Sequence, residues 1–421
     1  MEKIVVNGGL KLHLLKTEKY KTNTIVFKMK TPLTKEDATI RALLPHVLQS
    51  GTTTYPSVME LRTYLEELYG AVLYVDLQKK GEYHVISITM ELANEKFLKS
   101  DEQLLKKGIS LLAEILLNPK TVNNDSFDEQ IVEKEKRTLK QRIQAVFDDK
   151  MRYANLRLVQ EMCKNEPYSV PVNGYLEDVD QINAKNLFNY YKKSLAEDEL
   201  DLFIVGDFDE NEVVSLVNDK LQFAERKPKN ISKTSERKIE KENVVIEKQD
   251  LAQGKLNIGL RTNVSYGDDD YFALQVFNGL FGGFPHSKLF VNVREKASLA
   301  YYAASRLESH KGLMMVMTGI ETKNFEKALT IIKKQLQAMK NGEFTDAELV
   351  QTKAMIQNQM METLDTSRGY IEVMYHNVIS QAKVTEELWK EKINDVKKED
   401  VLKVGEKVQL DTVYFLSGME A

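Results

Sequence analysis

Apolar and polar residues follow two different periods along the chain. Residues 82–90 alternate apolar and polar side chains and are rich in β-branched types, which predicts a strand with one apolar face. Residues 104–116 instead carry apolar residues every three or four positions, the spacing of an amphipathic helix, and residues 328–339 repeat this stripe. Strands and helices are interspersed with hairpin-type turns, so the pattern predicts α+β domains with largely antiparallel sheets.

The pattern occurs twice. Residues 27–31 (FKMKT) resemble residues 258–262 (IGLRT), and Gly81 recurs as Gly312, both at an offset of 258 − 27 = 312 − 81 = 231. The later parts of the copies match at smaller offsets, with Phe127 onward resembling Phe344 onward and LFIVG at 202–206 resembling YFLSG at 414–418. A period near 200 residues is far longer than that of a solenoid, so we expect two homologous domains.

The boundary between the copies is predicted at residues 224–242. This stretch is charged, contains a proline and has no apolar period, as expected for an exposed linker. Residues 1–223 therefore form the predicted N-terminal domain and residues 243–421 the C-terminal domain. The linker is rich in lysine and arginine, but no aromatic residue is interleaved for base stacking, which favours a solvated tether over a nucleic-acid contact.

Composition excludes several classes of protein. The 421 residues include 59 Lys and Arg against 63 Asp and Glu, so the formal charge of −4 provides no field for nucleic acid or an anionic membrane. The single cysteine, Cys163, rules out an internal disulfide framework and suits a reducing compartment. With no apolar secretion segment at the N-terminus and no run long enough to span a bilayer, we expect a cytoplasmic protein.

One segment of the first copy suggests a chemistry. Residues 41–52 read RALLPHVLQSGT. Together with the duplication, this segment resembles the M16 (insulinase- and pitrilysin-like) zinc peptidases, whose first long helix carries H-x-x-E-H shortly before a Gly-Thr turn. In that motif two histidines on one helix face hold Zn²⁺, the glutamate takes a proton from the metal-bound water, and a carboxylate from a later helix completes the ligands.

The metal side of this motif is degenerate here. Alignment on the Gly-Thr turn puts Ala42 at the first histidine, Pro45 at the glutamate and His46 at the second histidine, and the later carboxylate position is Arg142. A guanidinium repels a cation, and without a base there is no activated water. Pro45 also disfavours an unbroken helix at this point. We expect no metal or other cofactor on this chain and no peptide hydrolysis by the chain alone, with His46 a buried, hydrogen-bonded histidine.

The second copy resembles the other half of the M16 site. Residues 281–302 carry a Gly-Gly loop, then SKLFVNVRE and LAYY, and resemble the C-terminal-domain motif of the family. The resemblance implies that Arg294 and Tyr301 bind the substrate backbone and polarise the reacting carbonyl. Arginine and a phenol are suitable donors to such oxygens. Tyr302 lies beside Tyr301, which leaves open which of the two faces the substrate. A surface ion pair for Arg294 and a packing role for Tyr301 are the alternatives.

The resemblance implies the LuxS/MPP-like metallohydrolase fold, with two homologous domains arranged as half of a clamshell. It also implies a non-catalytic, substrate-positioning subunit that pairs with a homologous zinc-bearing subunit to process peptides or small unfolded polypeptides, the Zn²⁺ residing in that partner. Two alternatives stay open: a non-enzymatic structural or assembly protein of the same fold, and an autonomous metallopeptidase with a relocated metal site.

Overall fold

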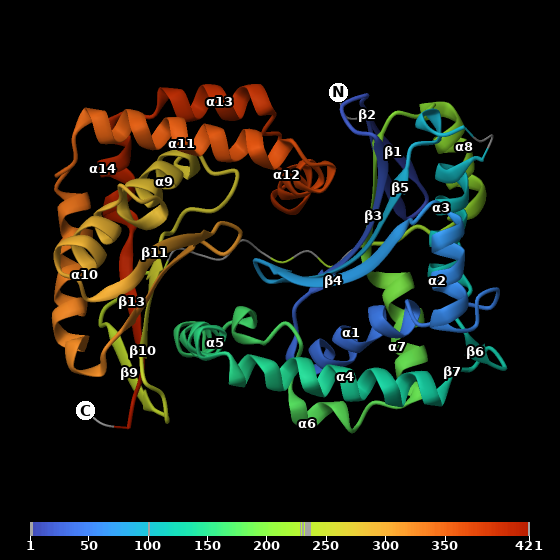
Figure 1. Ribbon diagram of the computed structural model, residues 1–421, viewed down its shortest axis with the longest axis horizontal. Helices are drawn as coiled ribbons and strands as arrows, with labels where there is room; N and C mark the ends of the chain where they lie inside the picture. The colour runs from blue at the N-terminus through green and yellow to red at the C-terminus, as the bar shows by residue number, and fades with distance from the viewer. Residues whose placement is uncertain (1–2, 100–101, 228, 230, 232–236, 420–421) are drawn as a thin grey trace. The chain divides into compact units, whose positions relative to one another are not determined.

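The computed structural model describes residues 3–99, 102–227, 229, 231 and 237–419. The chain forms two compact units, drawn in Figure 1. The first unit comprises residues 1–145, 170–232 and 366–371, and the second comprises residues 146–169, 233–365 and 372–421. The units therefore differ from the predicted domains 1–223 and 243–421, because the second unit includes residues 146–169 of the first copy. Within the predicted linker 224–242, residues 228, 230 and 232–236 lie outside the described residues.

The first unit is built on a six-stranded sheet in the order β1-β2-β8-β3-β5-β4. Its strands are β1 (Lys3–Asn7), β2 (Leu10–Lys16), β3 (Thr22–Pro32), β4 (Val72–Lys80), β5 (Tyr83–Ala93) and β8 (Glu199–Gly206), with a small hairpin of β6 (Thr121–Val122) and β7 (Ser126–Phe127). Its helices are α1 (Lys35–Leu48), α2 (Val58–Glu67), η1 (Glu95–Phe97), α3 (Leu104–Leu117), α4 (Glu129–Asp148), α6 (Leu176–Val179), α7 (Ala184–Glu197) and α8 (Glu210–Lys220). The β2–β8 pair is parallel and the other neighbours are antiparallel.

The second unit repeats this plan on a five-stranded sheet in the order β11-β12-β10-β13-β9. Its strands are β9 (Asn243–Lys248), β10 (Gly254–Arg261), β11 (Ala300–Glu308), β12 (Leu313–Ile320) and β13 (Gln409–Ser417). Its helices are α5 (Lys150–Met162), η2 (Pro167–Ser169), α9 (Tyr271–Asn278), the π-helices η3 (Gly279–Gly283) and η4 (Phe290–Lys296), η5 (Thr322–Asn324), α10 (Phe325–Lys340), α11 (Asp346–Leu364), the part of α12 (Ser367–Ser380) from residue 372 on, α13 (Glu386–Asp395) and α14 (Lys398–Lys407). Only β13 and β9 run parallel among these neighbours.

The two sheets confirm the duplication predicted from the sequence. In each, the strand carrying the repeated pentapeptide lies between the closing strand of the copy and the second strand of a hairpin. Each hairpin turns at the repeated glycine, where Gly81 has φ 58° and Gly312 has φ 70°. This left-handed conformation costs glycine nothing and strains other residues, so both copies retain glycine there.

Each sheet packs its apolar face against its own helices. In the first unit Phe27 and Ile88 are neighbours across β3 and β5 and are fully buried among residues of α1, α3 and α7. In the second unit Ile258 and Val316 occupy the corresponding places beneath α9, α10 and α14. The predicted α+β architecture with largely antiparallel sheets is therefore correct.

Helix α5 covers the other face of the second sheet. Its Leu158 and Met162 pack with Met315 and Tyr414 in a separate buried cluster. The chain then reaches Glu166, whose carboxylate contacts Arg261 at 2.6 and 3.1 Å and Lys311 at 2.7 Å. These contacts tie residues 146–169 to the second unit. Sequence periodicity predicts such a helix but does not say which sheet it will cover.

Candidate functional site

The zinc-motif positions of the first copy lie in the last turns of α1. Thr34 caps this helix by accepting a hydrogen bond from the Asp37 N–H at 3.3 Å. Ala42 and Pro45 are buried in the first core, and His46 is half-buried. The expected helix break at Pro45 is wrong: α1 runs through to Leu48. Pro45 lacks a backbone N–H and so removes one hydrogen bond of α1, and only three helical residues follow it.

The structure brings Arg142 of α4 close to His46. Burial lowers the pKa of His46 to about 4, and the positive charge of Arg142 adds to this effect while Asp76 opposes it. Burial also lowers the pKa of Arg142, which the negative charge of Glu135 partly offsets. The carboxylate of Glu135 accepts a hydrogen bond from the Ser50 hydroxyl at 3.2 Å. His46 is thus a neutral imidazole beside a guanidinium, half-buried where full burial was expected.

This donor set does not fit a zinc ion. Catalytic zinc takes three protein ligands and a water. Ala42 supplies no donor atom, Pro45 supplies no base, and Arg142 brings a positive charge to the place of the third ligand. Among the residues that the structure describes, no group of three or more His, Cys, Asp or Glu side chains is arranged to hold a metal ion.

The second unit presents Arg294 and Tyr301 together on its surface. Arg294 lies near the end of the π-helix η4, with its guanidinium carbon 4.4 Å from the ring centre of Phe290 and 5.3 Å from that of Tyr301. These are cation–π distances. Tyr301 is 81% exposed. Stacking uses the face of the guanidinium, so its N–H edge can still donate to a ligand. Within the described part of the chain, neither side chain donates a hydrogen bond to another residue.

A β-bulge distinguishes Tyr301 from Tyr302. The β11–β12 register shifts between Ala300 and Ala303, so the two tyrosines lie in the irregular stretch. Tyr302 turns inward and is half-buried, and its hydroxyl has no hydrogen-bond partner among the described residues. Burial accordingly raises the pKa of Tyr302. Of the two, Tyr301 is the one beside Arg294.

The surroundings of His84 could be predicted from the sequence, whereas the contact between His310 and His376 could not. His84 is 1% exposed, and its Nε2 lies 3.0 Å from the Val172 carbonyl, as expected for a core histidine. His310 lies in the β11–β12 turn, with its Nε2 2.6 Å from Nδ1 of His376 and the two rings stacked. No sequence signal links these two residues, because 66 positions separate them.

The site and fold define a class of protein. A duplicated sheet-and-helix domain with a zinc-type helix in the first copy and an Arg/Tyr motif in the second is the plan of an M16-type peptidase subunit. Residues 181–356 match the family model described as "Peptidase M16 inactive domain". The Bacillus subtilis protein described as "Probable inactive metalloprotease YmfF" is 55% identical over 414 residues, covering 98% of this chain and 97% of that protein. The chain therefore belongs to the M16 family and is a homologue of a protein described as a probable inactive metalloprotease.

Solved structures agree with this assignment. A conserved protein from Enterococcus faecalis V583 is 36% identical and superposes with a TM-score of 0.92, covering 100% of this chain and 99% of that chain. A peptidase M16 inactive domain from Pseudomonas fluorescens superposes with a TM-score of 0.80 over 100% of this chain and 99% of that chain. At 16% identity, the second comparison supports the fold alone.

No described helix has the length and apolar character needed to cross a membrane.

Proposed function

We propose that this chain is the non-catalytic, substrate-positioning subunit of a heterodimeric M16-like zinc peptidase that processes peptides or small unfolded polypeptides in the cytoplasm. The observation that carries the proposal is an asymmetry between the two copies. The first copy has Ala42, Pro45 and Arg142 where a metal centre needs donors and a base. The second copy has Arg294 and Tyr301 side by side and accessible.

The proposed roles follow from the chemistry of the pair. The Arg294 guanidinium is a permanent cation that can donate two parallel N–H bonds to a peptide carbonyl or carboxylate. The exposed Tyr301 hydroxyl can donate to an oxygen that becomes negative during carbonyl attack. Neither group activates a water molecule. The metal and the base therefore have to come from a second subunit with an intact H-x-x-E-H motif.

The test is to mix the purified chain with a zinc-bearing M16 homologue from the same cell and to assay peptide hydrolysis. We expect a stable complex that cleaves peptides faster than either chain alone. Arg294→Ala should lower kcat/KM of the complex by about 10²–10³-fold, the usual loss when one donor to a developing oxyanion is removed. Lys296→Ala is the matched control, because Lys296 is an exposed cation on the same π-helix. It should change kcat/KM by less than about twofold.

Two results contradict the proposal. One is the absence of a complex at micromolar concentration. The other is a complex whose peptidase activity is unchanged by Arg294→Ala, which would favour a structural or assembly role for the same fold. Stoichiometric zinc in the purified chain, together with turnover by the chain alone, would instead support an autonomous enzyme.

A further inference from the structure

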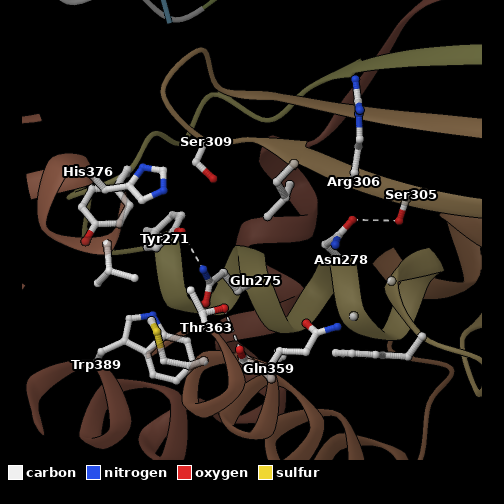
Figure 2. A pocket seen from close by; sticks show the side chains of 18 residues that line it. Tyr271, Gln275, Asn278, Ser305, Arg306, Ser309, Gln359, Thr363, His376 and Trp389 are labelled. Carbon is white, nitrogen blue, oxygen red and sulfur yellow. Dashed lines mark hydrogen bonds between the residues drawn. The ribbon is translucent and has the colours of Figure 1, made fainter. Parts of the chain in front are cut away.

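The second unit contains a cavity of about 430 Å³. Its walls come from α9, β11, α11, α12 and α13, as Figure 2 shows. Neither Arg294 nor Tyr301 lines it. The volume falls within the range of natural small-ligand pockets.

The elements around the cavity correspond to those that carry the zinc motif in the first unit. By the repeat offsets, α9, α11 and β11 are the counterparts of α1, α4 and β4. Gln359 on α11 occupies the position equivalent to Arg142 on α4, because 359 − 142 = 344 − 127 = 217. The first unit thus has a guanidinium at this position, and the second has a neutral amide at the cavity wall.

Polar and apolar side chains both line the cavity, and Arg306 is the permanently charged one among the described residues. No aspartate or glutamate is present among the described residues that line it. Arg306 contributes to the wall, but its side chain extends away from the other labelled residues in Figure 2 and pairs with Glu308 at 3.4 Å. The amides of Gln275, Asn278 and Gln359 therefore supply much of the hydrogen-bonding capacity of the walls, beside apolar and aromatic side chains. The latter include Phe284, Ile356, Met360 and Trp389.

Two polar groups in the wall have no hydrogen-bond partner among the residues that the structure describes. The amide of Gln275 donates to the Tyr271 hydroxyl at 2.5 Å, but its Oε1 is buried and accepts no hydrogen bond from the described residues. Trp389 is 3% exposed, and its Nε1–H also has no acceptor within the described part of the chain. Buried polar groups are normally paired, so an unpaired acceptor and an unpaired donor in one wall indicate a ligand that offers both.

We propose that this cavity binds an uncharged, amide-bearing segment of a peptide, about two residues long for a pocket of this volume. An amide presents an N–H to the Gln275 oxygen and a C=O to the Trp389 indole, and apolar side chains pack against Phe284, Ile356 and Met360. The absence of acidic groups from the described lining provides no partner for a cationic ligand. This site goes beyond the proposed function, because it lies within one unit and needs neither Arg294 nor a second subunit.

The test uses Trp389, the chain's single tryptophan, as the reporter. N-acetyl-leucyl-leucinamide is titrated into the purified full chain while indole emission is recorded. We expect a saturable change with a Kd of about 0.1 mM, a value typical of the efficiency of ligands of this size. The methyl ester of the same dipeptide lacks the terminal N–H donors and should bind about fivefold more weakly.

Two exposed neighbours on α11 provide the decisive comparison. Gln359 lines the cavity and Asn358 does not, and both amides are exposed. Gln359→Phe should weaken binding by about tenfold by filling the cavity, whereas Asn358→Phe should leave the Kd unchanged. Gln275→Met removes the inner amide at similar volume and should weaken binding by about fivefold. Because Gln359 is exposed, its variant keeps the test valid even if Gln275→Met fails to fold.

The proposal is overturned if the wild-type emission shows no saturable change up to about 10 mM probe, a concentration at which binding ceases to be specific. It is also overturned if Gln359→Phe and Asn358→Phe bind equally well. Arg294→Ala should bind the probe normally. Loss of peptidase activity in the complex tests the proposed function, and loss of probe binding tests the cavity, so the two proposals can fail independently.

Discussion

The helix that follows the first long strand differs between the two units. In the first unit α1 is a regular helix of 14 residues whose motif positions Ala42 and Pro45 are buried in the core. In the second unit α9 has only 8 residues and passes into the π-turns η3 and η4, which carry Arg294 to the surface beside Tyr301. The same place in the duplicated plan serves packing in one unit and presents polar groups in the other.

This difference supports our proposal that the second unit carries the substrate-binding residues. Apolar residues at motif positions add buried surface and contribute to stability. π-helical turns are rare and are found frequently at functional sites. The first unit therefore has regular structure at the degenerate motif, whereas the second has π-helical turns around a half-buried Arg294 and an exposed Tyr301.

A charged pair at the strand ends is common to both units, but its surroundings differ. Lys30 contacts Glu199 at 2.8 Å in the first unit. The corresponding pair in the second unit, Arg261 and Asp411, also lies at 2.8 Å. Of the two pairs, the second also contacts Glu166. Burial by itself would raise the pKa of Glu166, but the positive charges and hydrogen bonds of Arg261 and Lys311 lower this pKa to about 2.

The largest effect that we predict tests this extended network. Glu166→Gln leaves Arg261 and Lys311 buried with a missing counter-charge, so it should lower the free energy of unfolding by about 3 kcal/mol. Glu161→Gln is the control on the same segment, because Glu161 pairs with Arg157 in a partly exposed i,i+4 bridge at 2.8 Å. It should cost less than about 0.5 kcal/mol. Urea unfolding followed by Trp389 emission measures both. Equal losses would show that the network does not hold α5 on the second sheet.

The second prediction concerns acid. Burial, aided by the charge of Arg41, lowers the pKa of His84 to about 3, and that of His46 is lowered to about 4, so both are neutral when folded at pH 7. The unfolded chain binds these protons below pH 6.5, so stability is complete above that value and is lost as pH falls towards 4. At pH 5 His84 alone should account for a loss of about 2 kcal/mol, and His46 should add to it, because both folded pKa values lie below 5.

Hydrogen exchange of the β3 and β5 amides at pH 7 and pH 5 measures this loss in the first unit. His84→Gln keeps an N–H donor for the Val172 carbonyl but does not titrate, so it should reduce the pH dependence and leave the part that His46 contributes. His286→Gln in the second unit should leave the acid response of β3 and β5 intact. If His84→Gln and wild type lose protection equally, the acid sensitivity comes from other groups.

The third prediction separates the two adjacent tyrosines in the peptidase complex. Tyr301→Phe keeps the stack on Arg294 but removes the exposed hydroxyl, and should lower kcat/KM by about tenfold. Tyr302→Phe removes a hydroxyl that is buried and unpaired in the described structure, so it should change kcat/KM by less than about twofold and should not lower stability. The reverse ranking would assign the inward tyrosine to the substrate.

The smallest predicted effect is at the degenerate zinc motif. Arg142→Glu replaces a cation with an anion near His46 and should raise the His46 pKa by roughly half a unit, measured by NMR titration of the imidazole. Arg137→Glu makes the same charge change at an exposed position of α4 and should shift this pKa less. An unchanged His46 pKa in Arg142→Glu would mean that burial alone sets it.

Local patterns and the family motif made much of the fold predictable. The alternation in residues 82–90 gives strand β5. Ser57 caps α2 by accepting a hydrogen bond from the Glu60 N–H at 3.2 Å, and the Ser-x-x-Glu spacing at residues 57–60 is that of a capping box. The glycine turns and the repeated pentapeptide identify equivalent strands in the two sheets. All of these signals lie within a few residues of the structure that they specify.

Only the tertiary structure decided which distant segments meet. The sequence contains α5 but does not show that it covers the second sheet, and a tandem Tyr-Tyr does not reveal which ring turns outward at a bulge. The His310–His376 pair and the cavity that brings Gln275, Gln359 and Trp389 together draw on segments far apart in the chain. Local propensities fix the elements, but the contacts between elements depend on packing and burial summed over the whole unit, which no short window of sequence contains.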